Sequence, residues 1–244
     1  MPVRKQSKPL PTTKPSAKAV PRAKRQPAVK LPETEGAPEE KTSAAKKSVA
    51  KRSPVSAPPT LRELKVELRR KMRASLTKLR SRGPRSEKLC AAIVESAVWR
   101  RASVVAIFAP MESEPDIELL WPQAHGKTLC YPTIRMGGLD FVAVTHPESV
   151  TVGQFGIREP VFDPAHVIPP DEFDLVLVPG AAFTKDGQRL GRGGGFYDRL
   201  LATPGFRARK IGICFDRQIV ETLPIEPHDR RVDFVVTESG IQRG

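Results

Sequence analysis

The sequence predicts an α/β fold, in which a mostly parallel or mixed sheet is covered by helices in a three-layer domain. Three observations predict it. Residues 174–180 form a continuous apolar run bounded by turn residues, which is typical of a strand buried on both faces. A glycine-rich stretch follows at residues 186–195 and leads into a helical pattern. Residues 61–79 repeat apolar side chains at intervals of three and four, which predicts an amphipathic helix with a solvated basic face.

The other elements follow in order along the chain. A second helix is expected after the Gly83-Pro84 break and a third, short one after the first strand, whereas alternating apolar residues near 139–144 predict a half-exposed strand. We expect helices at 85–98, 116–124 and 196–201, and strands at 104–108, 128–131, 139–144, 171–179, 210–215 and 232–237.

Residues 1–59 differ in composition from the rest of the chain. They hold 14 Lys/Arg, 4 Glu and 11 of the 25 prolines but no aromatic residue, so they cannot build a core. We therefore expect a disordered basic tail at 1–59 and one α/β domain at 60–244. Basic residues exceed acidic ones by 8 within 60–88, whereas the remaining 156 residues carry an acidic excess of 4. A solvated leader is favoured for the tail, and contact with nucleic acid is left open.

The sequence also indicates the cellular compartment in which the protein is expected. No apolar run approaches the roughly 18 residues of a membrane span, and the tail has neither the apolar core of a secretory signal nor the pattern of a transit peptide. Cys90, Cys130 and Cys214 lack Cys-x-x-Cys spacing and are interpreted as reduced core residues. We expect a cytoplasmic protein without membrane contact that acts as a monomer.

Four glycines fall within five positions of the glycine-rich stretch: Gly191, Gly193, Gly194 and Gly195. Such a run can present main-chain N–H groups to an anion without Cβ atoms in the way. It is not a Walker A loop, because no Gly-Lys-Ser/Thr follows, and it is not a dinucleotide fingerprint, because Phe196 replaces the third glycine. A plain surface turn is the alternative. The order of strand, glycine loop and helix favours phosphate binding.

Several separated segments resemble the 5-formyltetrahydrofolate cyclo-ligase family, also called methenyltetrahydrofolate synthetase. The most specific is Arg-Leu-Gly-Arg-Gly-Gly-Gly-Phe-Tyr-Asp-Arg at 189–199, and the supporting segments are 65–69, 155–160, 223–229 and 232–233. The resemblance covers roughly residues 61–241. It implies a three-layer α/β fold and the conversion of 5-formyltetrahydrofolate with MgATP to 5,10-methenyltetrahydrofolate, ADP and phosphate. In this reaction the formyl oxygen is phosphorylated and N10 then closes the ring.

The resemblance also implies the site residues, with Lys65 and Arg192 as the catalytic charges. The implied ATP-binding residues are Lys65, Val66, Glu67, Leu68, Arg69, Arg189, Leu190, Gly191, Arg192, Gly193, Gly194, Gly195, Phe196 and Tyr197. The implied folate-binding residues are Ala109, Glu114, Arg192, Gly193, Gly194, Gly195 and Phe196. Asp198 and Asp233 match the magnesium ligands.

This chain departs from the family at a few positions. Thr184 replaces an aspartate, and Phe108 and Phe196 replace tyrosines, so a ring is kept where a hydroxyl is lost. His228-Asp229 is interpreted as a loop-structuring element and not as a catalytic pair. Two other functions stay open: a nucleic-acid-binding protein that uses the basic arm, and another α/β enzyme that holds phosphate without transferring it.

Overall fold

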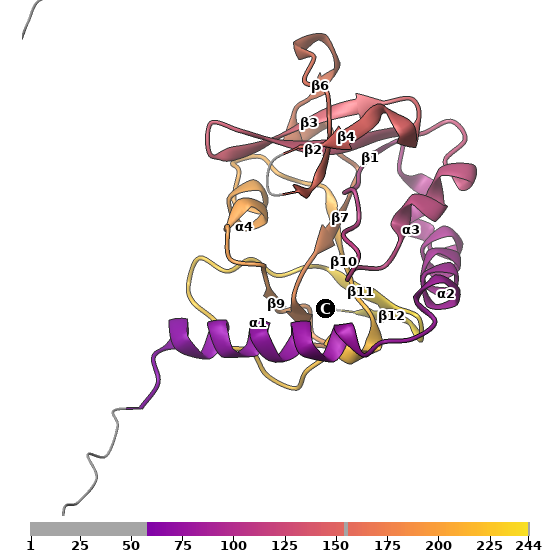
Figure 1. The fold of residues 1–244 in the computed structure, drawn as a ribbon. Helices are drawn as coiled ribbons and strands as arrows, with labels where there is room; N and C mark the ends of the chain where they lie inside the picture. The colour runs from indigo at the N-terminus through magenta and orange to yellow at the C-terminus, as the bar shows by residue number, and fades with distance from the viewer. Residues whose placement is uncertain (1–57, 154–155, 244) are drawn as a thin grey trace, which may run out of the picture. The chain divides into compact units, whose positions relative to one another are not determined.

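The computed structural model describes residues 58–153 and 156–243, and its central element is an eight-stranded sheet (Figure 1). The strand order is β12-β11-β10-β7-β1-β2-β3-β6, in which β11, β10, β7, β1 and β2 run parallel. The edge strand β12 is antiparallel to β11, β3 is antiparallel to β2, and the other edge strand β6 is antiparallel to β3. The predicted α/β class with a mostly parallel, mixed sheet is confirmed.

The strands are short, and most are bounded by loops that carry polar residues. Those of the central sheet are β1 (Val104–Ala106), β2 (Thr128–Arg135), β3 (Gly138–Val144), β6 (Val167–Ile168), β7 (Leu175–Pro179), β10 (Arg209–Ile213), β11 (Phe234–Thr237) and β12 (Gly240–Arg243). Two small antiparallel pairs lie outside it: β4 (Val150–Val152) with β5 (Arg158–Pro160), and β8 (Ala182–Phe183) with β9 (Arg189–Leu190).

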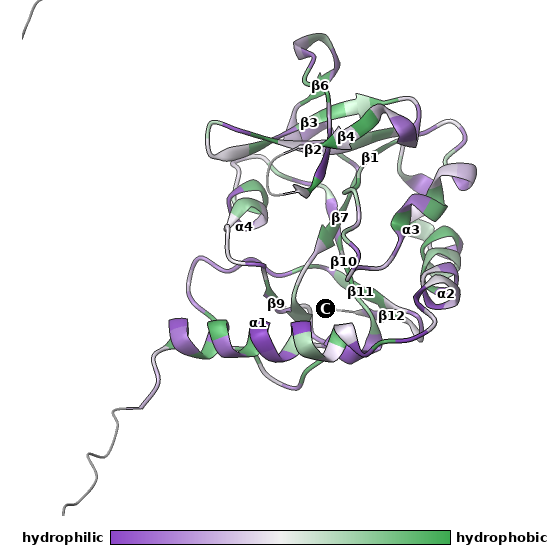
Figure 2. Ribbon diagram, in the orientation of Figure 1, coloured by the Kyte–Doolittle hydropathy of each residue, from purple (hydrophilic) through white to green (hydrophobic). Residues whose placement is uncertain are grey.

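Helices cover both faces of the sheet. One face packs against α2 (Arg82–Glu95), α3 (Ala97–Arg101) and the 3-10 helix η1 (Ile117–Gln123), through side chains such as Leu89 and Trp99. The other face packs against α4 (Phe196–Leu201) through Leu200. In Figure 2 the central strand β7 is hydrophobic, as expected for a strand buried on both sides.

Two expected helices differ in detail from those observed. The helix expected at 85–98 begins at Arg82 and is interrupted at Ser96, whose Oγ accepts a hydrogen bond of 3.1 Å from the Trp99 N–H and so begins α3. The helix expected at 116–124 is a 3-10 helix with Pro122 inside it, and a proline cannot donate to a helical ladder. The pairs β4–β5 and β8–β9 were not predicted, because strands of two or three residues are too short to show the alternation of apolar and polar side chains that marks a strand.

The first helix, α1 (Leu61–Thr77), begins at a capping box between Thr60 and Glu63. Its C-terminal end is anchored by Leu76, which with Leu79 packs against Phe215. The amphipathic pattern predicted for this helix is wrong for the N-terminal half, where Leu61 and Leu64 are 46% and 41% exposed, whereas Lys65 is only 5% exposed. The reason is that the helix crosses polar loops beside β9 at the lower edge of Figure 1.

The predicted tail at 1–59 falls almost entirely outside the described residues. Within the described residues, none of the helices combines the length and the apolar character needed to cross a membrane. Cys90, Cys130 and Cys214 are free and buried, so their assignment to the core is confirmed. Burial raises the pKa of the Cys90 and Cys130 thiols to about 12.

Candidate active site

The sheet has a topological switch point between β1 and β7. These strands are parallel neighbours, and the chain continues from β1 to β2 on one side and from β7 to β10 on the other. In open α/β sheets, ligands bind outside the carboxyl ends of the strands at such a point. The loop after β1 carries Ala109 and Glu114, and the segment after β7 leads into the glycines at 191–195. The fold therefore brings the expected folate and nucleotide residues to one edge.

Residues 191–195, called the glycine loop from here on, have a backbone that excludes ordinary side chains. Gly193 and Gly195 have φ values of 117° and 66°, which favour glycine. A Cβ on Gly194 would lie 2.7 Å from the Phe196 ring. Within the part of the chain that the structure describes, no protein group accepts a hydrogen bond from the N–H of Gly193, Gly194 or Gly195. These amides are therefore available to an anion.

Helix α1 brings two cations to this edge. The Nε of Arg69 donates to the carbonyl oxygen of Gly191 at 2.8 Å, and no carboxylate of the described residues pairs with its guanidinium. Lys65 lies one turn earlier on the same face of α1. Val66 is exposed, Leu68 is half-buried, and Glu67 pairs with Arg70 on the solvent side of the helix. The structure thus brings Lys65 and Arg69 to the site and turns Val66 and Glu67 away.

Lys65 is held by two carboxylates. Its Nζ lies 2.6 Å from an oxygen of Glu226 and 2.6 Å from an oxygen of Asp229. Burial lowers the pKa of Lys65, but the hydrogen bonds and charges of the two carboxylates outweigh it, so the pKa is raised. Asp229 also accepts a hydrogen bond from the Glu226 N–H at 2.7 Å, so it shapes the loop that carries it. The sequence did not predict the contact with Lys65, because Glu226 and Asp229 are separated from Lys65 by 161 and 164 positions and no local pattern extends that far.

Arg189 lies behind the glycine loop and not on its open side. It is 4% exposed, and it donates to Asp198 at 2.7 Å and to the carbonyl oxygen of Pro179 at 3.3 Å. Asp198 also accepts from the Arg230 N–H at 3.1 Å. Arg189 therefore joins the end of β7 to the first turn of α4, and the adjacent Leu190 is buried with it. Both residues support the loop from beneath.

Arg192, in contrast, reaches across to the loop that follows β1. Its guanidinium makes two contacts with Glu114, with Nε at 2.8 Å and the second nitrogen at 2.6 Å from the same oxygen. The other carboxylate oxygen accepts from the Met111 N–H at 2.9 Å. The Glu114 side chain is 6% exposed and Ala109 is buried close to it in the chain. One expected phosphate contact and one expected folate contact are thus bonded to each other.

Phe196 is the first residue of α4, and its half-buried ring lies against the glycine loop. The guanidinium carbon of Arg199 lies 4.9 Å from the ring centroid, and Arg199 donates to the carbonyl oxygens of Gly194 and Gly137. The ring therefore takes part in packing that links the glycine loop to the β2–β3 hairpin. This use of the ring needs no hydroxyl.

Tyr197 and Thr184 contribute polar groups beneath the loop. The Tyr197 hydroxyl is buried and has no hydrogen-bond partner among the described residues, and burial raises its pKa well above the usual value. Thr184 is 2% exposed, bonds to Asp186 and accepts from the Gln188 N–H at 3.0 Å. Thr184 thus fixes the turn between β8 and β9.

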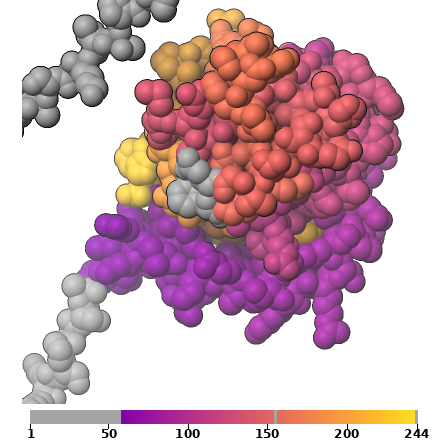
Figure 3. Space-filling model, turned by 45° about the horizontal axis from the view of Figure 1, so that its top comes forward, coloured from indigo at the N-terminus to yellow at the C-terminus, as the bar shows by residue number. Residues whose placement is uncertain are grey.

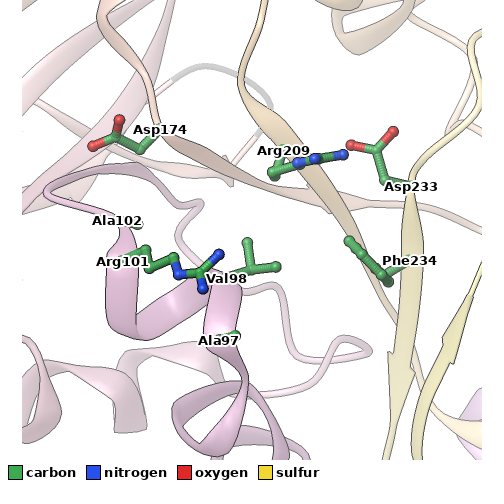
Figure 4. A pocket seen from close by; sticks show the side chains of 8 residues that line it. All are labelled: Ala97, Val98, Arg101, Ala102, Asp174, Arg209, Asp233 and Phe234. Atoms are coloured by element: carbon green, nitrogen blue, oxygen red, sulfur yellow. The ribbon is translucent and has the colours of Figure 1, made fainter.

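The structure does not bring Asp233 to Asp198. Asp233 precedes β11 and lies 3.0 Å from the Nζ of Lys210, while its other oxygen accepts from the Lys210 N–H at 2.9 Å. It lines a cleft of about 640 Å³ with Asp174 and Arg209, which stand at the starts of β7 and β10 (Figure 4). These are the amino ends of the strands, whereas the glycine loop lies at the carboxyl ends. Within the described residues there is no group of three His, Cys, Asp or Glu side chains arranged to hold a metal.

A small cavity lies where α1 meets the glycine loop. It measures about 50 Å³ and is lined by Arg69, Met72, Arg73, Leu76, Ser113, Ala181 and Arg192. A space of this size holds no more than one or two water molecules. Nucleotide would therefore have to approach from the open side of the loop or displace α1.

The chain is similar to known proteins of one family. The 5-formyltetrahydrofolate cyclo-ligase family model matches residues 61–238. The 5-formyltetrahydrofolate cyclo-ligase of Escherichia coli K12 is 36% identical over 149 residues, which is 57% of this chain and 80% of that protein. The mouse protein of the same name is 26% identical over 196 residues, or 72% of this chain and 93% of that protein.

Solved structures extend the likeness to three dimensions. The NMR structure of Aquifex aeolicus 5,10-methenyltetrahydrofolate synthetase aligns with a TM-score of 0.65 at 34% identity, covering 74% of this chain and 92% of that one. A synthetase from Mycoplasma pneumoniae, at 21% identity and a TM-score of 0.58, shares the fold. Since the family model spans nearly the whole described body and the site residues lie on its matched segments, the chain belongs to the 5-formyltetrahydrofolate cyclo-ligase family of enzymes.

Proposed function

We propose that this protein converts 5-formyltetrahydrofolate and ATP to 5,10-methenyltetrahydrofolate, ADP and phosphate. The observation that carries the proposal is the meeting of three segments at the carboxyl edge of the sheet: the glycine loop, the Lys65 and Arg69 face of α1, and the Glu114 loop. Family membership supports the reaction class, and the meeting of the three segments supports a shared binding site for the two substrates.

The phosphates of ATP would lie on the glycine loop. The Arg69 guanidinium lies beside Gly193, so its unused donors and the N–H groups of Gly193 to Gly195 would together stabilise negative charge on the transferring group. Phosphoryl transfer depends mainly on positioning and charge neutralisation, because the protein does little covalent chemistry. Arg192 would join them once it leaves Glu114.

In the proposed reaction the formyl oxygen attacks the γ-phosphorus, an O–P bond forms, and the bond to the β-phosphate oxygen breaks to release ADP. N10 then adds to the activated carbon and loses its proton, and the C–O bond breaks to release phosphate. Phosphorylation is needed because an amide oxygen is a poor leaving group. Glu114, freed from Arg192, would accept hydrogen bonds from the N–H edge of the pterin.

Magnesium would suit this site through Asp198. The Oδ1 of Asp198 is bonded to Arg189 and the Arg230 N–H, whereas its Oδ2 has no hydrogen-bond partner among the described residues. Mg²⁺ is commonly held by one or two carboxylates together with phosphate oxygens and waters. The ion would screen the charge of the phosphates. Asp233 has no part in this proposal, because it lies beside Lys210 at the amino ends of the strands.

The direct test combines the full-length protein with 5-formyltetrahydrofolate and MgATP and follows the near-ultraviolet absorbance of the methenyl product and the release of phosphate. We expect one phosphate per methenyl group formed and none without folate. Absence of product at every magnesium concentration would contradict the proposal. ATP hydrolysis that is independent of folate would favour a different phosphate-binding enzyme.

Adjacent arginines of α1 provide a matched pair of variants for this assay. Arg69→Met removes the guanidinium that touches Gly191, and the loss of one charge-assisted contact predicts a KM for ATP raised by roughly 10-fold or more. Arg70→Met removes a 74% exposed side chain whose one bonded partner among residues 58–153 and 156–243 is Glu67, so its kinetics should match the wild type. Equal effects of the two variants would argue that α1 does not contact the nucleotide.

A further inference from the structure

The segment before β11 supplies two carboxylates, Glu226 and Asp229, that have no role in the proposed chemistry but contact Lys65. We propose that they are positioning residues, which fix the N-terminal half of α1 and aim the Lys65 ammonium at the nucleotide phosphates. This inference rests on the proposed function, since it assigns how that site is assembled.

The geometry leaves Lys65 able to bind a ligand while it is held. An ammonium group has three N–H donors, and two are used by Glu226 and Asp229, each at 2.6 Å. The Lys65 side chain is 7% exposed, so it cannot sample other directions freely. Arg69 lies one helical turn further on the same face of α1 and contacts Gly191, and the proposal assigns the third donor of Lys65 to a nucleotide phosphate held beside the glycine loop.

The N-terminal half of α1 depends on this contact because none of its apolar side chains is buried. Leu61, Leu64 and Val66 are 46%, 41% and 58% exposed, and the only buried residues of the helix are Lys65 and Leu76. In Figure 3 the indigo surface of this helix forms a ridge along the lower edge of the molecule. Polar contacts by Lys65 and Arg69 therefore hold this half to the body, whereas Leu76 holds the other half.

The charges of the cluster are mutually stabilised. The hydrogen bond from Lys65 lowers the pKa of Glu226. Burial is the largest single influence on Asp229 and opposes its charged form, but the hydrogen bonds from Lys65 and from the Glu226 N–H, together with the nearby positive charge, outweigh burial, so the pKa of Asp229 is also lowered. All three groups are thus ionised at neutral pH. One ammonium and two carboxylates give the cluster a net charge of −1, so the cluster as a whole does not attract a phosphate, and its proposed effect on nucleotide is to fix the position of the Lys65 ammonium for direct contact.

The test is a double-mutant cycle between Lys65→Met and Asp229→Asn, with kcat, KM for ATP, KM for folate and Tm measured for each protein. Asn keeps the shape of the side chain and an oxygen that can accept from the Glu226 N–H, but it loses the charge that holds Lys65. We expect Asp229→Asn to raise the KM for ATP about 10-fold, with kcat and the KM for folate changed less than about 2-fold. In the Lys65→Met background the same change should alter the KM for ATP less than about 2-fold.

Two further variants keep the test decisive. Glu226→Gln should raise the KM for ATP in the same direction and serves if Asp229→Asn does not fold. Asp163→Asn, which changes an exposed carboxylate paired with His166, should leave all constants unchanged.

The outcomes separate this inference from the function on which it rests. If the wild type neither binds MgATP in calorimetry nor forms product, the proposed function fails. If the wild type is active and Asp229→Asn leaves the KM for ATP unchanged or lowers it, the inference is overturned. An equal effect of Asp229→Asn with and without Lys65 would also overturn it, because Asp229 would then act only through general stability.

Discussion

Arg189 and Arg70 make ion pairs of the same length that differ in burial, and we predict that their removal has different consequences. Arg189 lies 2.7 Å from Asp198, with the two side chains 3% and 14% exposed. Arg70 lies 2.7 Å from Glu67, with the side chains 74% and 43% exposed. The substitution to Met at each position keeps much of the stem and removes the charge.

Arg189→Met should lower the free energy of unfolding, because it leaves buried acceptors without their donor. Arg189→Met leaves the Asp198 carboxylate with a single main-chain donor, the Arg230 N–H, and leaves the Pro179 carbonyl oxygen without its side-chain donor. Breaking a buried pair by removing one partner costs about 3–5 kcal/mol, and the partial exposure of Asp198 places this case near the lower value. About 3 kcal/mol in a folded body of this size corresponds to a fall in Tm of about 6–12 °C.

The assay is unfolding by heat and by urea, followed by circular dichroism, for the wild type and both variants. Arg70→Met should unfold as the wild type does, because exposed ion pairs contribute little. The reasoning would be refuted if Arg189→Met were as stable as Arg70→Met but failed to bind MgATP. Arg189 would then act on the ligand directly and not as a support beneath the loop.

Three further predictions concern backbone shape, packing and pH. Gly193→Ala places a Cβ at a φ of 117°, which should cost about 1–3 kcal/mol and weaken ATP binding, whereas Gly138→Ala, with only an ordinary contact at 3.7 Å, should be neutral in the same assays. Gly212→Ala would overlap the Phe183 ring inside the sheet and should lower the free energy of unfolding by about 1–3 kcal/mol, measured in urea; an unchanged midpoint would contradict it. The pKa of Asp229 is lowered in the folded protein, so the stability that its charge gives to the fold is present above the unfolded pKa near 4 and is lost as the pH falls through the folded pKa. The difference in Tm between the wild type and Asp229→Asn should therefore be full at about pH 6 and shrink below about pH 4.

The central strands and the glycine loop were predictable because their signals are local. The apolar run at β7 reports burial on both faces, and a cluster of glycines reports backbone that side chains cannot adopt. The 3-10 helix η1 and the break at Ser96 were harder to predict, since they depend on one proline and one capping hydroxyl. The exposure of Leu61 and Leu64 in the N-terminal half of α1 could not be predicted, because it depends on the polar loops that the helix crosses in the folded protein.

The sequence by itself determined the α/β class, the position of the glycine loop and the family to which the chain belongs. Only the tertiary structure decided which charges meet: Arg189 turns inward to Asp198, Arg192 crosses to Glu114, and Lys65 enters a pair of carboxylates. It also placed Asp233 beside Lys210, at the amino ends of β10 and β11. The physical reason is range, because periodicity and glycine spacing act over a few residues, whereas an ion pair between residues more than a hundred positions apart exists only once the strand order has brought them together.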